Sequence, residues 1–254
     1  MILLIKVIIG LCLLCLLHSY LFYPLMLRLL SIGKKANNLI YTQDKDFPFV
    51  SVLMSVYNEE AVIAQKLDSL LQLNYPTNKL RIYIGSDCSG DKTNEIVSAY
   101  ADKHPLIQFF PFEKRQGKPG VVNELFETSV SDHSLADEHL FLVTDASVML
   151  EKEALRHLVK HFKNPEIVIV DAHMIHTGMK SKGISKSEHQ YISSEVKLKN
   201  REGLIWGKMI GPFGGCYTIR SSWFSKVPDN FLVDDFYITM RVFERGGLAI
   251  NELD

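Results

Sequence analysis

Cysteine is scarce in this chain, with four residues among 254. Cys12 and Cys15 have a C-x-x-C spacing, but they lie inside a long apolar run, where the pair cannot serve as a zinc or redox site. Cys88 and Cys216 are far apart in the sequence and indicate neither a disulfide framework nor a metal site. The cysteine content is therefore consistent with a reducing compartment.

Motifs of several common enzyme classes are also absent. The sequence contains no G-x-G-x-x-G dinucleotide loop, no Walker A lysine loop, no G-x-S-x-G elbow and no H-E-x-x-H helix. The formal net charge is -1 and no run of like charges occurs, which argues against a nucleic-acid partner, because such proteins usually carry a concentrated basic face. No internal repeat or low-complexity tract is present either.

Residues 7–27, by contrast, form an apolar run that is interrupted only by His18, Ser19 and Pro24. A run of this length is about what spans a bilayer. A cleaved signal peptide is the alternative, but no small-residue cleavage pattern follows the run. We therefore predict a retained membrane anchor over residues 1–30, embedded in the lipid bilayer.

Basic residues flank this run on both sides. Arg28, Lys34 and Lys35 follow it, and Lys6 and the amino terminus precede it. The excess on the C-terminal side is slight, but its direction predicts that the rest of the chain lies on the cytoplasmic side. In a bacterium the membrane would be the inner or plasma membrane.

The remainder of the chain predicts a short linker and one α/β domain. Residues 31–48 are polar and read as the linker, and residues 49–254 as the domain. Apolar, β-branched runs alternate with helix-like stretches, which predicts an open, twisted, mostly parallel sheet flanked by helices. The predicted strands are 49–56, 80–84, 107–112, 140–143 and 167–170, and the predicted helices are 61–73, 93–100, 121–126, 154–162 and 235–244.

The alternation breaks after residue 173. Residues 181–199 are polar and predict a helix toward their end. Residues 206–217 carry four glycines and a proline among apolar residues, which predicts a loop pressed close to a ligand.

Carboxylates follow the predicted strands at regular points. Asp87 and Asp145 each come directly after an apolar run, and Asp234 and Asp235 open the last predicted helix. The carboxyl edge of an open α/β sheet is where ligands bind. Carboxylates gathered there can hold a divalent cation, bind a nucleoside and accept a proton, and a sugar-nucleotide transferase needs all three. Taken singly, each is also explained by an Asx-turn or a helix cap.

Six motifs in a fixed order carry a resemblance to a known family. They are VYNEE (56–60), SDCSGD (86–91), RQGKPG (115–120) with Asn123 behind it, DAS (145–147), GPFGGCYTIR (211–220) and the pair Asp234-Asp235. In this order the chain resembles the family 2 glycosyltransferases, inverting enzymes with a GT-A fold, over residues 49–250.

The resemblance implies roles for the donor side of the site. The nucleotide sugar would be bound by Ser55, Tyr57, Glu59, Asp87, Lys118, Asn123 and Asp145. Among these, Asp87 would accept a hydrogen bond from the base, and Lys118 would neutralise part of the diphosphate.

The resemblance also implies a cation, a base and an acceptor side. Asp145 would bind Mg²⁺ or Mn²⁺, which prefer oxygen ligands. Ser147 stands where a second aspartate often occurs and would be a weak ligand. Asp235 would be the general base, supported by Asp234, with Gly214 and Gly215 on the acceptor side.

Together these features predict an inverting glycosyltransferase. It would move a sugar from a nucleoside-diphosphate sugar, most simply a UDP-sugar, to a hydroxyl of a glycan or lipid-linked acceptor. Two alternatives stay open: a non-catalytic membrane protein that binds nucleotide sugars, and a sugar nucleotidyltransferase. A Q-x-x-R-W motif, which polysaccharide-building members carry after the last helix, is absent, so we expect a sequence truncated at its C-terminus.

Overall fold

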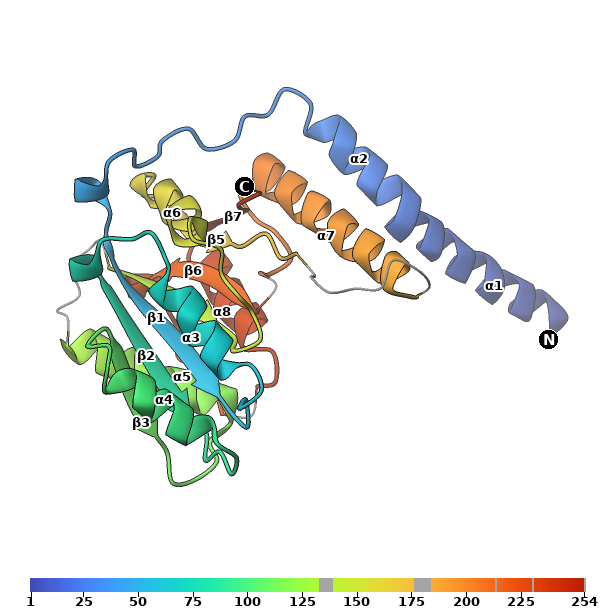
Figure 1. Cartoon of the computed structure of the whole chain (residues 1–254). Coiled ribbons are helices and arrows are strands. Elements are labelled where there is room, and N and C mark those ends of the chain that lie inside the picture. Colours follow the sequence, from blue (N-terminus) through green and yellow to red (C-terminus); the bar gives the residue numbers. More distant parts are fainter. Residues whose placement is uncertain (133–138, 176–183, 213, 230, 254) are drawn as a thin grey trace.

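A seven-stranded sheet forms the centre of the computed structural model, which describes residues 1–132, 139–175, 184–212, 214–229 and 231–253 (Figure 1). The strand order is β3-β2-β1-β4-β6-β5-β7. The strands are β1 (Phe49–Val56), β2 (Leu80–Ser86), β3 (Ile107–Pro111), β4 (His139–Thr144), β5 (Ile167–Asp171), β6 (Cys216–Arg220) and β7 (Leu248–Asn251). The predicted α/β fold with a mostly parallel sheet is confirmed.

The central strands are buried on both faces, because most of their residues are apolar. On one face, Val50, Val52 and Met54 of β1 pack with α3 (Ile63–Leu71), α4 (Thr93–Ala101) and α6 (Ala154–Val159). On the other face, Leu53 packs with α5 (Gly117–Asp132) and α8 (Asp234–Glu244). Successive residues of a strand point to opposite faces, so β1 supplies both halves of the core.

Two strands and several element bounds, among them the start of α5, differ from the sequence prediction. The structure adds β7 and also β6, which lies antiparallel between β4 and β5 and includes part of the stretch predicted as a loop. The alternation of strands and helices in the sequence predicts parallel neighbours joined by helical crossovers. It does not predict an antiparallel strand such as β6, which follows the long helix α7 (Ile184–Trp206). Helix α5 starts at Gly117 instead of residue 121, so Lys118 lies in its first turn. The first residues of the predicted helix 181–199, up to 183, lie outside the described residues.

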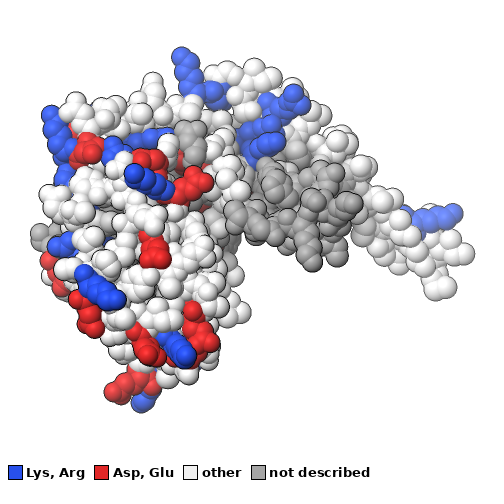
Figure 2. Space-filling model, viewed as in Figure 1, with Lys and Arg blue, Asp and Glu red and all other residues white. Residues whose placement is uncertain are grey.

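The N-terminal apolar run forms one long helix. It consists of α1 (Ile2–Leu17), the π-helical stretch η1 (His18–Phe22) and α2 (Tyr23–Leu30). By length and composition this helix of 29 residues, with a mean hydropathy of 2.5, can cross a membrane. It projects from the domain in Figure 1, and in Figure 2 its surface is almost free of charged atoms.

The C-terminal part of this helix contacts the domain through α7. Leu27 is fully buried, and the Tyr23 hydroxyl donates a hydrogen bond to Glu202. The second carboxylate oxygen of Glu202 accepts the Ile210 backbone N–H at 3.2 Å. Helix α7 therefore connects the N-terminal helix to the start of the glycine-rich segment.

Candidate functional site

The carboxyl edge of the sheet collects most of the predicted site residues. Strands β2, β1 and β4 are neighbours, and their ends lead into Asp87, Tyr57 and Asp145 respectively. Ser55, the second-last residue of β1, is half-buried and pairs with Gly85 of β2. The fold thus brings together residues that lie about 30 to 90 positions apart in the sequence.

Lys118 connects the two acidic groups of the site. Its ammonium lies 2.7 Å from Asp145 Oδ1 and 3.7 Å from Asp234 Oδ2. Burial lowers the pKa of Lys118, but the carboxylates of Asp145, Asp234 and Asp235 raise it more, so the net shift is upward. The lysine is therefore a fixed positive charge between β4 and α8.

Asp234 and Asp235 differ sharply in their surroundings, although they are adjacent. Asp234 is 7% exposed, and its pKa is raised, mainly by burial and further by Asp235, against the opposing effect of Lys118. Asp235 is half-buried and lies against Gly214, where a Cβ atom would come 2.6 Å from Asp235 Oδ2. Gly214 also has a φ of +59°, which disfavours any other residue. Gly214, predicted on the acceptor side, thus lies next to Asp235, the predicted base.

Asp145 is the candidate for holding a divalent cation. Its side chain is 39% exposed, and it already holds the cationic end of Lys118. Its backbone N–H donates to the Gly215 carbonyl at 3.0 Å, which fixes the loop to β6. Ser147 is exposed, and no group of three or more His, Cys, Asp or Glu side chains suited to a metal occurs among the described residues. The donor set fits a cation held by one protein carboxylate together with oxygens of a ligand.

Glu59 lies within electrostatic reach of this group. Its pKa is raised by burial first and then by the negative charges of Asp145 and Asp91. The backbone N–H of Glu59 donates to Thr93 Oγ1 at 2.8 Å, and Asn58 takes a positive φ of 53°. The turn after β1 is therefore held against the start of α4.

Asp87 holds the basic loop. The carboxylate, 2% exposed, accepts the backbone N–H groups of Gln116 at 2.7 Å and Gly117 at 3.1 Å, and Arg115 Nε at 3.3 Å. These bonds set the entry into α5 and hence the position of Lys118. Asp87 thus has a structural task in addition to its predicted role of accepting a hydrogen bond from the nucleobase.

Arg115 is a site residue that the sequence prediction did not single out. Its guanidinium lies over the Tyr57 ring, 3.5 Å from the centroid, and its side chain is 55% exposed. A cation and an aromatic face stacked at a sheet edge make a flat, polar-edged surface of the kind that bases stack on. The sequence signal that could have identified Arg115 was its position as the first residue of the RQGKPG motif.

Asn123 binds the backbone of Val227. Its amide donates to the Val227 carbonyl at 2.8 Å and accepts the Val227 N–H at 3.0 Å, which ties the segment before α8 to α5. A role in donor binding stays a prediction, and the structure gives this side chain a different task.

Residues 51–227 match the model of glycosyl transferase family 2. The chain belongs to this family. The predicted resemblance is thereby confirmed.

Relatives support the same assignment. A probable glycosyltransferase, YdaM of Bacillus subtilis (strain 168), is 29% identical over 215 residues, which cover 80% of this chain and 48% of that protein. The chain therefore spans about half the length of this curated relative.

Two solved structures share the fold. The mannosyltransferase PcManGT from Pyrobaculum calidifontis, in complex with GDP-Man and Mn²⁺, has a TM-score of 0.73 at 20% identity, covering 95% of this chain and 65% of that chain. Residues 1–349 of S. aureus TarS, in complex with UDP, give a TM-score of 0.61 at 19% identity, covering 81% of this chain and 58% of that chain.

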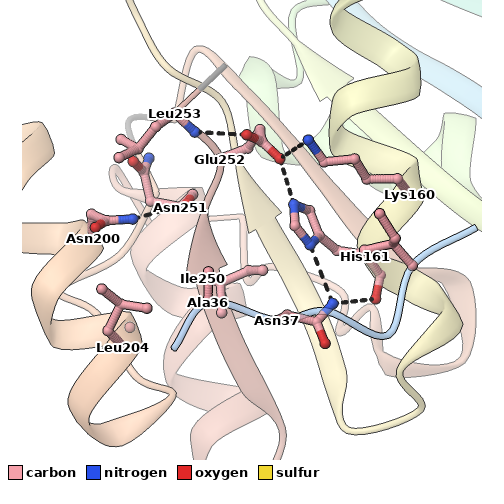
Figure 3. Close-up of a pocket in the computed structure, with 12 residues that line it drawn as sticks. Ala36, Asn37, Lys160, His161, Asn200, Leu204, Ile250, Asn251, Glu252 and Leu253 are labelled. Carbon is pink, nitrogen blue, oxygen red and sulfur yellow. Dashed lines mark hydrogen bonds and ion pairs between the residues drawn. The ribbon is translucent and has the colours of Figure 1, made fainter. Parts of the chain in front are cut away.

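A cavity of about 320 Å³ lies apart from this site, between the linker, α7 and the end of β7 (Figure 3). Glu252 is 6% exposed and binds both Lys160, at 2.8 Å, and His161. The other ring nitrogen of His161 lies 3.2 Å from the Asn37 amide. These bonds fasten the linker to the domain, and the cavity contains no predicted site residue.

We expect Asp87→Ala to loosen the basic loop, because three N–H groups lose their acceptor. The free energy of unfolding should fall by about 1–3 kcal/mol in urea denaturation. Amide hydrogen exchange of Gln116 and Gly117 should become faster. Asp91→Ala is the matched control, since Asp91 also accepts two backbone N–H groups but from Glu60 and Thr93. Unchanged exchange at Gln116 and Gly117 in Asp87→Ala would contradict this account of the loop.

Proposed function

We propose that this protein is an inverting glycosyltransferase that moves a sugar from a nucleoside-diphosphate sugar to an acceptor hydroxyl. One observation carries the proposal: Lys118 contacts both Asp145 and Asp234. The residues proposed to hold the cation and the diphosphate therefore lie beside the proposed general base, Asp235. Membership of glycosyl transferase family 2 supports it.

Asp235 acts as the general base in this proposal. It stands in the first turn of α8 and lies against Gly214. Its carboxylate takes the proton of the acceptor hydroxyl as the acceptor oxygen attacks the anomeric carbon from the side opposite the leaving group. The bond between that carbon and the diphosphate oxygen breaks, and the nucleoside diphosphate leaves with the electron pair.

Lys118 stabilises the charge that develops on the leaving diphosphate. A Mg²⁺ or Mn²⁺ ion held at Asp145 would supply Lewis-acid stabilisation of the same charge when bound. Asp234 is buried and paired with Lys118, and it directly precedes Asp235. It therefore fixes the position of the lysine relative to the general base.

The nucleoside binds at the other end of the edge in this proposal. The stacked side chains of Tyr57 and Arg115 form a surface on which the nucleobase can stack. Asp87, at the end of β2, binds Arg115 and so lies next to this surface. UDP is our choice of nucleotide, supported by the UDP complex of TarS, whereas the GDP-Man complex of PcManGT makes GDP the competitor to test.

The acceptor is a glycan or a lipid-linked sugar at the membrane. Support comes from the apolar N-terminal helix, which we propose as a bilayer anchor with the catalytic domain on the cytoplasmic side. Leu232, Val233 and Phe236 are also exposed next to the two catalytic aspartates, a surface suited to an apolar part of an acceptor.

Calorimetric titration of UDP and GDP, with and without Mn²⁺, tests the donor site through its metal ligands. We expect Asp145→Ala to abolish the Mn²⁺ dependence of UDP binding, and Ser147→Ala to leave it nearly intact. Ser147→Asp should tighten Mn²⁺ binding by adding a charged oxygen ligand. Greater damage from Ser147→Ala than from Asp145→Ala would mean that the cation lies elsewhere. UDP binding without donor hydrolysis would favour the non-catalytic alternative.

We expect Asp235→Asn to lower turnover by roughly 10²–10⁴, because the amide keeps the shape but cannot take the proton. Donor affinity should be unchanged, since the base faces the acceptor. Turnover is measured as transfer, or as release of UDP from the donor by hydrolysis.

Two glycine variants give this test a structural counterpart. Gly214→Ala and Gly211→Ala both place a side chain at a φ of +59°, but only position 214 would push on Asp235. Gly214→Ala should therefore lose clearly more turnover than Gly211→Ala. Near-normal transfer by Asp235→Asn would make Asp234 the candidate base instead.

The anchor has a separate test. In cells, the full chain should stay with membranes during carbonate extraction, and a chain beginning at residue 45 should be released, because it lacks the apolar helix. Recovery of the full chain in the soluble fraction would refute the anchor without touching the proposed chemistry.

A further inference from the structure

A buried lysine lies beneath the site and has no part in the chemistry described above. Lys66 on α3 is 0% exposed. Its ammonium donates hydrogen bonds to Thr144 Oγ1 at 2.8 Å and to the Val148 carbonyl. Both of these acceptors are uncharged groups.

Such a residue is costly to the fold. Lysine is almost never fully buried unless it is paired, because an ammonium loses its hydration inside a protein. Burial lowers the pKa of Lys66 to about 8, against the opposing effects of Cys216 and Asp145. An apolar side chain of the same length would fill the space without this cost. A specific task must therefore explain the lysine.

The two acceptors of Lys66 stand at the two ends of one short loop. Thr144 directly precedes Asp145, and Val148 directly follows Ser147. Within the loop, the Val148 N–H donates to the Asp145 carbonyl at 3.3 Å. On the far side, Thr144 Oγ1 also donates to the Gly215 carbonyl at 3.1 Å. One ammonium thus closes the loop that presents Asp145 and joins it to α3.

We propose that Lys66 is a positioning residue of the donor site, which holds the loop 144–148 in the conformation that presents Asp145 to a divalent cation and the diphosphate. The inference rests on the proposed function and deepens it. Without these hydrogen bonds the loop that carries Asp145 would have to become ordered when the cation binds, and this ordering would lower the affinity for the cation. Groups that orient a metal ligand from behind commonly matter about ten- to hundredfold in metal affinity.

Charge and position predict opposite effects, which makes the inference testable. A positive charge near Asp145 repels a divalent cation, so removing it should tighten cation binding if charge alone matters. If the lysine holds the loop, its removal should weaken cation binding. A purely structural role would change stability and leave the cation affinity alone.

The experiment measures the Mn²⁺ concentration that gives half-maximal UDP binding to the full chain, by calorimetry and by the electron paramagnetic resonance signal of free Mn²⁺. We expect Lys66→Met to raise this concentration about ten- to hundredfold. UDP binding without metal should be unchanged. The melting temperature should be equal or higher, because a buried charge is gone.

Leu67→Ala is the matched control. Leu67 is equally buried on the same helix but packs in the apolar core, so its truncation should lower the melting temperature and leave the Mn²⁺ concentration unchanged. Thr144→Val removes one acceptor of the lysine and keeps its volume, and should shift the Mn²⁺ concentration in the same direction by a smaller factor. This variant decides the question if Lys66→Met does not fold.

The outcomes separate this inference from the proposed function. An unchanged or lowered Mn²⁺ concentration in Lys66→Met, or in Thr144→Val where it replaces that variant, overturns the role of Lys66 alone. Failure of the unaltered chain to bind UDP or GDP with Mn²⁺ overturns the proposed function, and the inference with it.

Discussion

The ion pairs of Lys118 are the interaction on which the rest of the site depends. Burial raises the pKa of Asp234, and the negative charges of Asp235 and Asp145 raise it further. A single ammonium from the first turn of α5 lies 2.7 Å from one of them and 3.7 Å from another. It allows the end of β4 and the start of α8 to lie side by side at the edge where we propose that the donor binds.

The backbone around Lys118 is held just as firmly. Asp87, at the end of β2, binds the N–H groups that lead into α5, and Asn123 on the same helix binds the backbone of Val227 ahead of α8. Gly85 lies where a side chain would come 2.4 Å from Val121 Cγ1, so the bare strand lets α5 pack closely. Polar contacts at the edge and close packing below it therefore fix the same helix from two sides.

The N-terminal helix and the domain are also coupled. Tyr23 binds Glu202 on α7, whose other oxygen binds Ile210 at the start of the glycine-rich segment. The linker is fastened by Asn37 to His161, which in turn binds Glu252 (Figure 3). The glycine-rich segment is connected in this way to the apolar helix, which is consistent with the membrane-linked acceptor that we propose.

The sequence by itself determined the features that depend on local patterns. Apolar runs of strand length gave five strands, the carboxylates after them gave the acidic positions, and the order of six motifs gave the family. Tertiary structure decided what depends on contacts between distant residues: the antiparallel insertion of β6, the stack of Arg115 on Tyr57, the tie between Asn123 and Val227, and the buried Lys66 beneath Asp145. Periodicity reports which face of an element is buried, but it carries no information about which distant partner covers that face. From the sequence, a lysine in a helix is expected to be exposed to solvent. Only the tertiary structure shows that Lys66 is buried against Thr144 of β4.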